Sequence, residues 1–327
     1  MALMIARRIL HGVLLILAVI VLDFFLLHLA PGSIAETLAS ASGGASPALL
    51  AEIKREYGLN KPLYVQLWLY LGQVAHGNLG ESYFYNRPVV TLIGERLPAT
   101  LLLVLSAQGW SILLGTLMGV IAATKPRGLR STVVGVLAMV GYATPAFWLG
   151  IMLLILFAYL LPIFPTSGMM SIDLIGAPLA VQAVDILQHL VLPSFTLGFI
   201  YLAQYSRLAR ASMIDALQQD YIRTARAKGV SEFRVIFKHA LRNALLPVVT
   251  VGGLQFSQVI AGAVLIETVF NWPGMGRLAY NAVLRRDYTL VLGILVVAAI
   301  VVVVMNLLTD LAYYWLDPRI RDARSAR

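Results

Sequence analysis

Long apolar segments recur along this chain, separated by shorter polar ones. Each apolar run has about 20 residues or more, enough for a helix to cross a hydrocarbon core about 30 Å thick. The last run is rich in valine, which favours strands, but only a helix satisfies its own backbone groups in lipid. The pattern therefore predicts six transmembrane helices, within residues 1–30, 97–123, 132–161, 187–205, 247–270 and 290–315.

Polar stretches divide the chain around these runs. Residues 31–96 are rich in turn-forming residues and predict a solvent-side segment with short helices, one of them over 47–57. The five later runs form one core membrane domain, 97–316, which contains a polar loop at 206–246. A basic tail follows at 317–327.

Composition agrees with a bundle of helices in a membrane and excludes several chemistries. Hydrophobic residues make up 59% of the 327 residues and charged residues only 13%, which is too apolar for a soluble domain. The chain has no cysteine, so disulfides, thiolate metal ligands and cysteine nucleophiles are excluded. We therefore expect an all-α polytopic membrane protein.

Some of the runs carry local features that predict how the helices pack. Asp23 interrupts the first run, but the surrounding apolar residues outweigh its cost of insertion. Gly115 and Gly119 are four residues apart in the second run, a spacing that lets two helices approach closely. Pro145 lies inside the third run and predicts a kink, because proline removes a backbone donor.

The run at 247–270 is unusual because it carries many polar and small residues. Gln255, Ser257, Gln258 and Glu267 all lie within it. One interpretation is a tightly packed seam between helices; the other is that these polar side chains line a passage through the membrane.

Basic residues indicate the orientation of the bundle. With the N-terminus in the cytoplasm, 17 of the 25 Lys and Arg residues fall in cytoplasmic segments, eight of them between Arg207 and Arg242. This asymmetry satisfies the positive-inside rule. The net charge of +9 therefore reports topology, and we do not expect nucleic-acid binding.

The sequence contains no recognisable constellation for catalysis or metal binding. The five histidines are dispersed, and none is followed by Glu, as a His-Glu-x-x-His zinc helix requires. No Gly-Lys dipeptide occurs, so the chain lacks the phosphate-binding loop of an ATPase. If ATP drives this protein, another polypeptide must bind it, and the chain needs a surface that contacts that partner.

Residues 220–247 form a polar, basic segment with helical patterning. A short helix is expected before Gly229, which can end it in the left-handed conformation. Ser231 can cap a second helix, with Glu232 in its first turn, and Pro247 marks the return to the membrane. The second helix is expected to have one apolar face, formed by Phe233, Ile236, Phe237, Ala240, Leu241 and Ala244.

Two interpretations of this helical hairpin follow from its composition. A rigid pair of short helices could dock into a groove of another protein. An amphipathic hairpin could instead rest on anionic lipid headgroups through its basic stripe of Arg234, Lys238 and Arg242.

Several motifs resemble a known family. The segment Asp-Tyr-Ile-Arg-Thr-Ala-Arg-Ala-Lys-Gly, residues 220–229, is similar to the cytoplasmic loop of permease subunits from ATP-driven, binding-protein-dependent importers of the peptide and nickel group. Only Ala225 and Gly229 match the general Glu-Ala-Ala-x3-Gly signature, and Pro247 lies five residues beyond the proline of that signature. Other similar motifs span nearly the whole chain, at His28–Gly32, Tyr57–Pro62, His76–Gly80, Arg96–Thr100, Pro145–Trp148, Leu192–Ser194 and Val269–Gly276.

The sequence also departs from that family at two places. Ser33 stands where relatives often carry Asp after Pro-Gly, which puts any role of that carboxylate in doubt. The loop before His189 is longer than usual, which bears on contact with a binding protein.

The resemblance implies a six-helix type I importer (MetI-like) permease fold with a cytoplasmic coupling helix, in a bacterial inner membrane, with both termini in the cytoplasm and 31–96 in the periplasm. The implied partners are a second, homologous permease subunit, two cytoplasmic ATPase subunits that bind ATP and Mg²⁺, and a periplasmic solute-binding protein. This chain would bind no cofactor. The residues implied in ATPase coupling are Arg223, Thr224, Ala225, Arg226, Lys228, Gly229, Ser231, Glu232, Phe233 and Phe237.

Three functional hypotheses follow. The first is a non-catalytic transport subunit for peptides, with glutathione, nickel or a sugar conjugate as alternative substrates. The second is a secondary transporter that couples to an ion gradient through Asp23, Glu267 or Asp310, and it predicts transport by this chain alone. The third is a membrane enzyme, which no group of residues supports.

Overall fold

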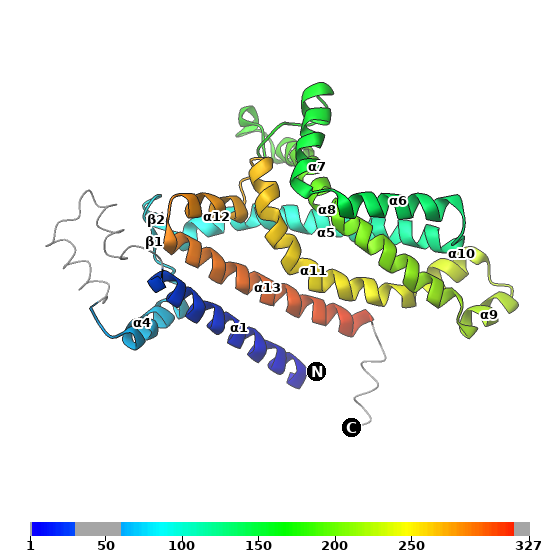
Figure 1. Cartoon of the computed structure of the whole chain (residues 1–327), viewed down its shortest axis with the longest axis horizontal. Helices are drawn as coiled ribbons and strands as arrows, with labels where there is room; N and C mark the ends of the chain where they lie inside the picture. The colour runs from blue at the N-terminus through cyan, green and yellow to red at the C-terminus, as the bar shows by residue number, and fades with distance from the viewer. Residues whose placement is uncertain (1, 30–59, 317–327) are drawn as a thin grey trace. The chain divides into compact units, whose positions relative to one another are not determined.

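The computed structural model describes residues 2–29 and 60–316 of the chain (Figure 1). The predicted helix over 47–57, Ser33 and the basic tail at 317–327 lie outside the described residues. The chain forms two compact units. The first consists of Met1–Pro98 with Leu278–Val304, and the second of Ala99–Arg277 with Met305–Arg327.

The first unit contains α1 (Ala2–Leu29), α4 (Leu63–Ala75) and a small antiparallel hairpin of β1 (Glu81–Ser82) and β2 (Arg87–Pro88). α1 contacts α4, where His28 Nε2 lies 3.0 Å from Gln66 Oε1. The hairpin was not predicted from the sequence, because its strands are only two residues long.

A buried carboxylate holds this small hairpin in place. The hydroxyl of Ser82 donates a hydrogen bond to Asp287 at 2.5 Å. Asp287 also accepts a hydrogen bond from the backbone nitrogen of Leu290 at 3.2 Å, at the start of α13 (Tyr288–Leu316). The same side chain therefore fixes the hairpin and caps the helix.

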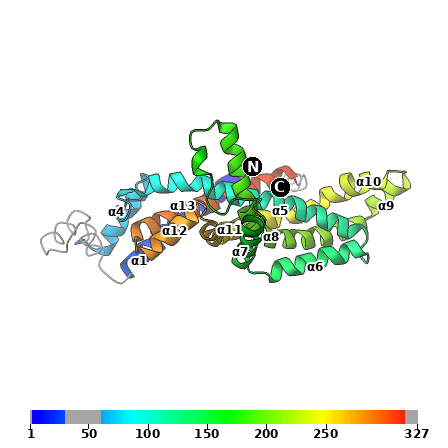
Figure 2. The ribbon, with the colours of Figure 1, turned by 90° about the horizontal axis from the view of Figure 1, so that it is seen from above.

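The second unit is built around α8 (Leu179–Leu217). The helices that pack against it include α6 (Leu129–Ala143), α7 (Ala146–Leu154) and α11 (Leu241–Val269). α6 and α8 lie side by side in both views (Figures 1 and 2). The unit's largest apolar core includes the buried side chains of Leu103, Val104, Leu197, Val259, Ile266, Phe270 and Trp272.

α5 (Val89–Thr124) approaches α8 very closely within this unit. A Cβ atom at Gly115 would lie 2.9 Å from the carbonyl oxygen of Leu202, and one at Gly119 would lie 2.6 Å from Cβ of Ala209. Such separations are too short for real side chains, so only glycine fits. The predicted close helix approach at Gly115 and Gly119 is confirmed.

The third apolar run is divided into two helices. α6 ends at Ala143, and α7 with the π-helix η1 (Ile155–Leu160) continues at an angle of 102° to it. The break follows from Pro145: Thr144 before it is extended, with φ −87° and ψ 123°, as the residue before a proline prefers. The structure confirms a kink in this run, although the bend is large enough to separate the two helices.

Five helices in the described ranges are long and apolar enough to cross a membrane, and a sixth span results if the bent pair counts as one. The helices extend beyond the apolar runs; α8, for example, continues to Leu217 through polar residues such as Arg210. An apolar run marks only the part of a helix that suits lipid. The pattern therefore does not show how far each helix continues outside the membrane.

Candidate functional site

A helical hairpin within the second unit holds the residues expected to contact a partner. It consists of α9 (Asp220–Ala227), α10 (Glu232–Arg234) and the π-helix η3 (Val235–Ala240). The hairpin lies beyond the end of α8, and η3 continues directly into α11 (Figures 1 and 2). We call residues 220–240 the coupling hairpin.

The inner side of the coupling hairpin is packed. Ile222, Val235 and Ala240 have no exposed surface and belong to one cluster with Val120 of α5 and Met213 of α8. Because buried apolar contacts fix a segment far more firmly than surface polar contacts do, the hairpin is a rigid extension of the helices beneath it.

The turn between its two arms depends on glycine. Gly229 has φ +73°, and a Cβ atom at this position would meet nothing within 4 Å. The predicted left-handed stop is thus confirmed. Ser231 holds the N-cap position, but its side chain makes no capping hydrogen bond, so its predicted role as a side-chain cap is wrong. Its carbonyl oxygen instead accepts a hydrogen bond from the backbone nitrogen of Val235 at 3.0 Å.

An ion pair joins the two arms across the turn. Arg226 Nη2 donates to Glu232 Oε1 at 2.6 Å, and Arg226 Nε donates to Oε2 at 3.2 Å. The hydrogen bond to Glu232 raises the pKa of the Arg226 guanidinium. The two-point geometry fixes the relative orientation of the arms more firmly than a single contact could, although both side chains are about half exposed.

The outer side of the hairpin carries an aromatic pair. Phe233 is 70% exposed and Phe237 is 37% exposed, and their ring centroids are 4.7 Å apart. The predicted apolar face included both rings, and the structure leaves them exposed, whereas Ala240 and Ala244 of the same face are buried. Val235, which the prediction left out, is also buried; it lies five residues before Ala240, and residues five apart share a face in the π-helix η3.

The coupling residues expected from the sequence form one accessible surface with a single exception. Ala225 is buried in the apolar cluster, so its small side chain serves packing. The exposed members are Arg223, Thr224, Arg226, Lys228, Gly229, Ser231, Glu232, Phe233 and Phe237. The hairpin thus presents basic side chains beside two aromatic rings.

The four residues considered for a polar passage do not share one surface. Gln255 is buried and Glu267 has no exposed surface, whereas Ser257 is half-buried and Gln258 is exposed. On the same helix, a Cβ atom at Gly253 would overlap the side chain of Thr309 in α13. α11 therefore forms a packed seam at Gly253, and only part of its polar set is accessible.

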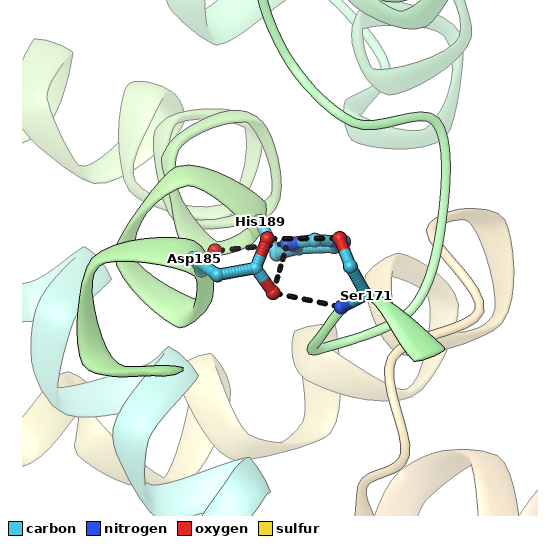
Figure 3. Close-up of polar contacts among 3 residues, drawn as sticks. All are labelled: Ser171, Asp185 and His189. Atoms are coloured by element: carbon cyan, nitrogen blue, oxygen red, sulfur yellow. Dashed lines mark hydrogen bonds and ion pairs between the residues drawn. The ribbon is translucent and has the colours of Figure 1, made fainter. Parts of the chain in front are cut away.

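A second polar cluster lies in the same unit, at the start of α8 (Figure 3). Asp185 accepts hydrogen bonds from the backbone nitrogen of Ser171 at 2.7 Å and from its hydroxyl at 2.8 Å. His189 Nδ1 lies 2.8 Å from the backbone oxygen of Asp185 and 3.5 Å from its carboxylate.

This cluster resembles a catalytic triad in composition but not in arrangement. The Ser171 hydroxyl donates to the carboxylate, whereas a nucleophile would need to be bonded to histidine. The cluster instead ties the loop before α8 to the helix. The i, i+4 spacing of Asp185 and His189 predicts that these two side chains meet on one helix face. It cannot reveal Ser171, which lies in the loop before the helix. Among residues 2–29 and 60–316 no group of three or more potential metal ligands is found.

Two family models cover most of the sequence. The model for binding-protein-dependent transport system inner membrane components matches residues 115–322, and the model for the N-terminal part of such membrane components matches residues 1–104.

Curated relatives match over nearly their full length. The di/tripeptide transport system permease protein of Pseudomonas aeruginosa is 42% identical over 320 residues, which cover 94% of this chain and 95% of that protein. The oligopeptide transport system permease protein of Bacillus subtilis is 38% identical over 321 residues, which cover 98% and 99% of the two chains.

A solved structure shares the fold. An inward-facing structure of the MetNI methionine ABC transporter matches 69% of this chain and 96% of its own, with a TM-score of 0.53 and 15% identity. At that identity the match supports the architecture alone, an all-α permease fold of the type I importer class.

Proposed function

The chain belongs to the family of binding-protein-dependent transport system inner membrane components, and from this premise we propose that it forms half of the pathway through which an ATP-driven importer carries peptides. The observation that supports peptides is the near full-length match to di/tripeptide and oligopeptide permeases. As a permease subunit the chain has no catalytic role, and separate subunits bind ATP and Mg²⁺.

The coupling hairpin is the surface we assign to the ATPase subunit. Its inner side is fixed to α5 and α8, and its outer side presents Phe233, Phe237 and several basic residues. Exposed aromatic side chains next to Arg are typical of protein–protein contacts. A rigid base is needed as well, because only a stiff segment passes the movement of a docked partner to the helices beneath it.

The remaining partners follow from the proposed topology. The excess of basic residues supports a cytoplasmic location for the hairpin and both termini; in this topology residues 31–96 face the periplasm, where a solute-binding protein delivers the substrate. A homologous second permease subunit supplies the other half of the pathway. On α11, the accessible Ser257 and Gln258 are better placed to line that pathway than the buried Gln255 and Glu267.

Reconstitution into proteoliposomes tests this function. Vesicles would contain this chain, its companion permease and the ATPase subunits, with binding protein on the opposite side from ATP. A defined mixture of dipeptides to pentapeptides, quantified by mass spectrometry, would serve as the probe. We expect uptake only when both ATP and binding protein are present. Peptide uptake by this chain alone, driven by an ion gradient, would instead support a secondary transporter.

A further inference from the structure

Side chains from two other helices cap the first turn of α12 (Met275–Leu284). A helix leaves its first backbone N–H groups without partners inside the helix. Here the hydroxyl of Thr100, on α5, accepts the N–H of Met275 at 2.7 Å. The carboxylate of Glu267, on α11, accepts the N–H of Arg277 at 2.8 Å and a further backbone hydrogen bond from Gly276.

Thr100 and Glu267 are also bonded to each other. The Thr100 hydroxyl donates to Glu267 Oε1 at 2.6 Å, so this one oxygen atom both gives and receives a hydrogen bond. Glu267 has no exposed surface, and Thr100 is 2% exposed. The polar contacts of the carboxylate in this cluster are all with donors, which come from α5 and from the first turn of α12.

The backbone of residues 274–276 packs directly against α11, with no space for side chains at the two glycines. A Cβ atom at Gly274 would overlap the Glu267 carboxylate, and one at Gly276 would lie 2.7 Å from Cα of Val264. The neighbouring Trp272 is fully buried, and its indole nitrogen donates to the carbonyl oxygen of Ala99 at 2.9 Å. Ala99 and Thr100, two consecutive residues of α5, therefore form hydrogen bonds with Trp272 and Met275, which follow α11.

The same cluster lies at the far end of the helix that begins in the coupling hairpin. Residues Glu232–Val269 form one continuous helical segment of 38 residues, whose direction changes within α11 (Figure 1). Phe233 and Phe237 lie at one end of this segment and Glu267 at the other. A movement of the hairpin can therefore be passed along this segment to its Glu267 end.

We propose that Thr100, Glu267 and the first turn of α12 form a latch that makes α5 follow α11 when a partner moves the coupling hairpin. This inference rests on the proposed function. Thr100 and Glu267 are positioning residues: both are buried, and they transmit movement from one helix to another. Glu267 is thus assigned to coupling within the fold rather than to an ion or a passage.

Variants of Thr100 test the latch in the complete complex. Thr100→Val keeps the shape of the side chain but removes both hydrogen bonds, whereas Thr100→Ser retains the hydroxyl. Thr116→Val is the matched control, because Thr116 is a buried threonine of α5 whose hydroxyl has no hydrogen-bond partner among the described residues. The readout is the number of peptides imported per ATP hydrolysed in proteoliposomes, with the same peptide mixture as probe.

We expect the number imported per ATP to fall about tenfold in Thr100→Val, since the loss of one buried hydrogen bond changes an equilibrium by up to about that factor. Thr100→Ser and Thr116→Val should remain close to wild type. An unchanged ratio in Thr100→Val would overturn the latch while leaving the proposed function intact. Absence of ATP-driven uptake by the wild-type complex would instead remove the proposed function.

A variant that does not assemble would be informative as well. If Thr100→Val cannot be recovered in the complex, Glu267→Gln takes its place, because it keeps the size of the side chain and one acceptor oxygen. A loss of coupling in assembled Glu267→Gln complexes supports the latch. Failure of both variants to assemble, while Thr116→Val assembles, would show that the cluster serves folding alone and would contradict the proposal.

Discussion

Replacement of Gly229 by Asp is the sharpest perturbation of the coupling hairpin. The glycine lies at the turn between the two arms, with φ +73° and open space where a side chain would project. Lys228 precedes it, and the ion pair of Arg226 with Glu232 lies beside the turn. The substitution adds bulk and negative charge to the exposed tip while leaving the packed inner side unchanged.

The cost to the fold itself should be small. The left-handed conformation costs a non-glycine residue about 1–2 kcal/mol, and Asp tolerates it better than most residues. No steric cost is added, because the new Cβ would meet nothing within 4 Å. The cost to binding of a partner protein at this surface is larger. Burial of an unpaired carboxylate costs about 2 kcal/mol or more of binding free energy, which corresponds to an affinity about 30-fold weaker.

ATP hydrolysis stimulated by the loaded binding protein, measured in proteoliposomes, is the appropriate assay. Gly77→Asp provides the matched control, because Gly77 has φ +76°, open space around its Cβ position and a place in the turn after α4. Both variants should assemble and melt within a few degrees of wild type. Only Gly229→Asp should lose stimulated hydrolysis. Full stimulation in Gly229→Asp, or an equal loss in Gly77→Asp, would refute the reasoning.

Three further outcomes are expected. Arg226→Glu should weaken coupling by about 1 kcal/mol, since the pair it breaks is half exposed, and added Glu232→Arg should restore it; a double variant no better than the single would contradict a bridging role. Gly119→Leu should lower the melting temperature in detergent, because overpacking costs about 1–3 kcal/mol, whereas Gly109→Leu, which faces open space, should not; equal melting temperatures would contradict the close approach. Ser171→Ala should speed hydrogen exchange of residues 162–178 about tenfold, and unchanged exchange would show that the hydroxyl does not hold this loop.

Much of the fold follows directly from local sequence physics. Apolar runs of sufficient length predicted the helices that can span a membrane, and Pro145 predicted the break in the third run. Gly115 and Gly119 marked a helix crossing, and Gly229 marked the hairpin turn. Each of these features depends on a single residue type or on spacing, so a sequence displays it.

The parts that sequence reasoning missed depend on contacts between distant segments. The π-helix η3 buries Val235 together with Ala240, and no residue spacing signals an i, i+5 bond in advance. α12 was missed because a polar turn precedes it and its first N–H groups are capped from other helices. Glu267 looked like a candidate for a passage, since its partner Thr100 lies 167 residues away.

The central claim is that the coupling hairpin contacts an ATPase subunit rather than lipid. The chain has no cysteine, so Phe233→Cys can carry a single photoreactive group at the most exposed aromatic position of the hairpin. Tyr159→Cys, which is equally accessible in η1, is the control. We expect the label at residue 233 to attach to the ATPase subunit of the assembled complex and the label at residue 159 to leave that subunit unmarked. Attachment of the label at residue 233 to lipid alone would contradict the account.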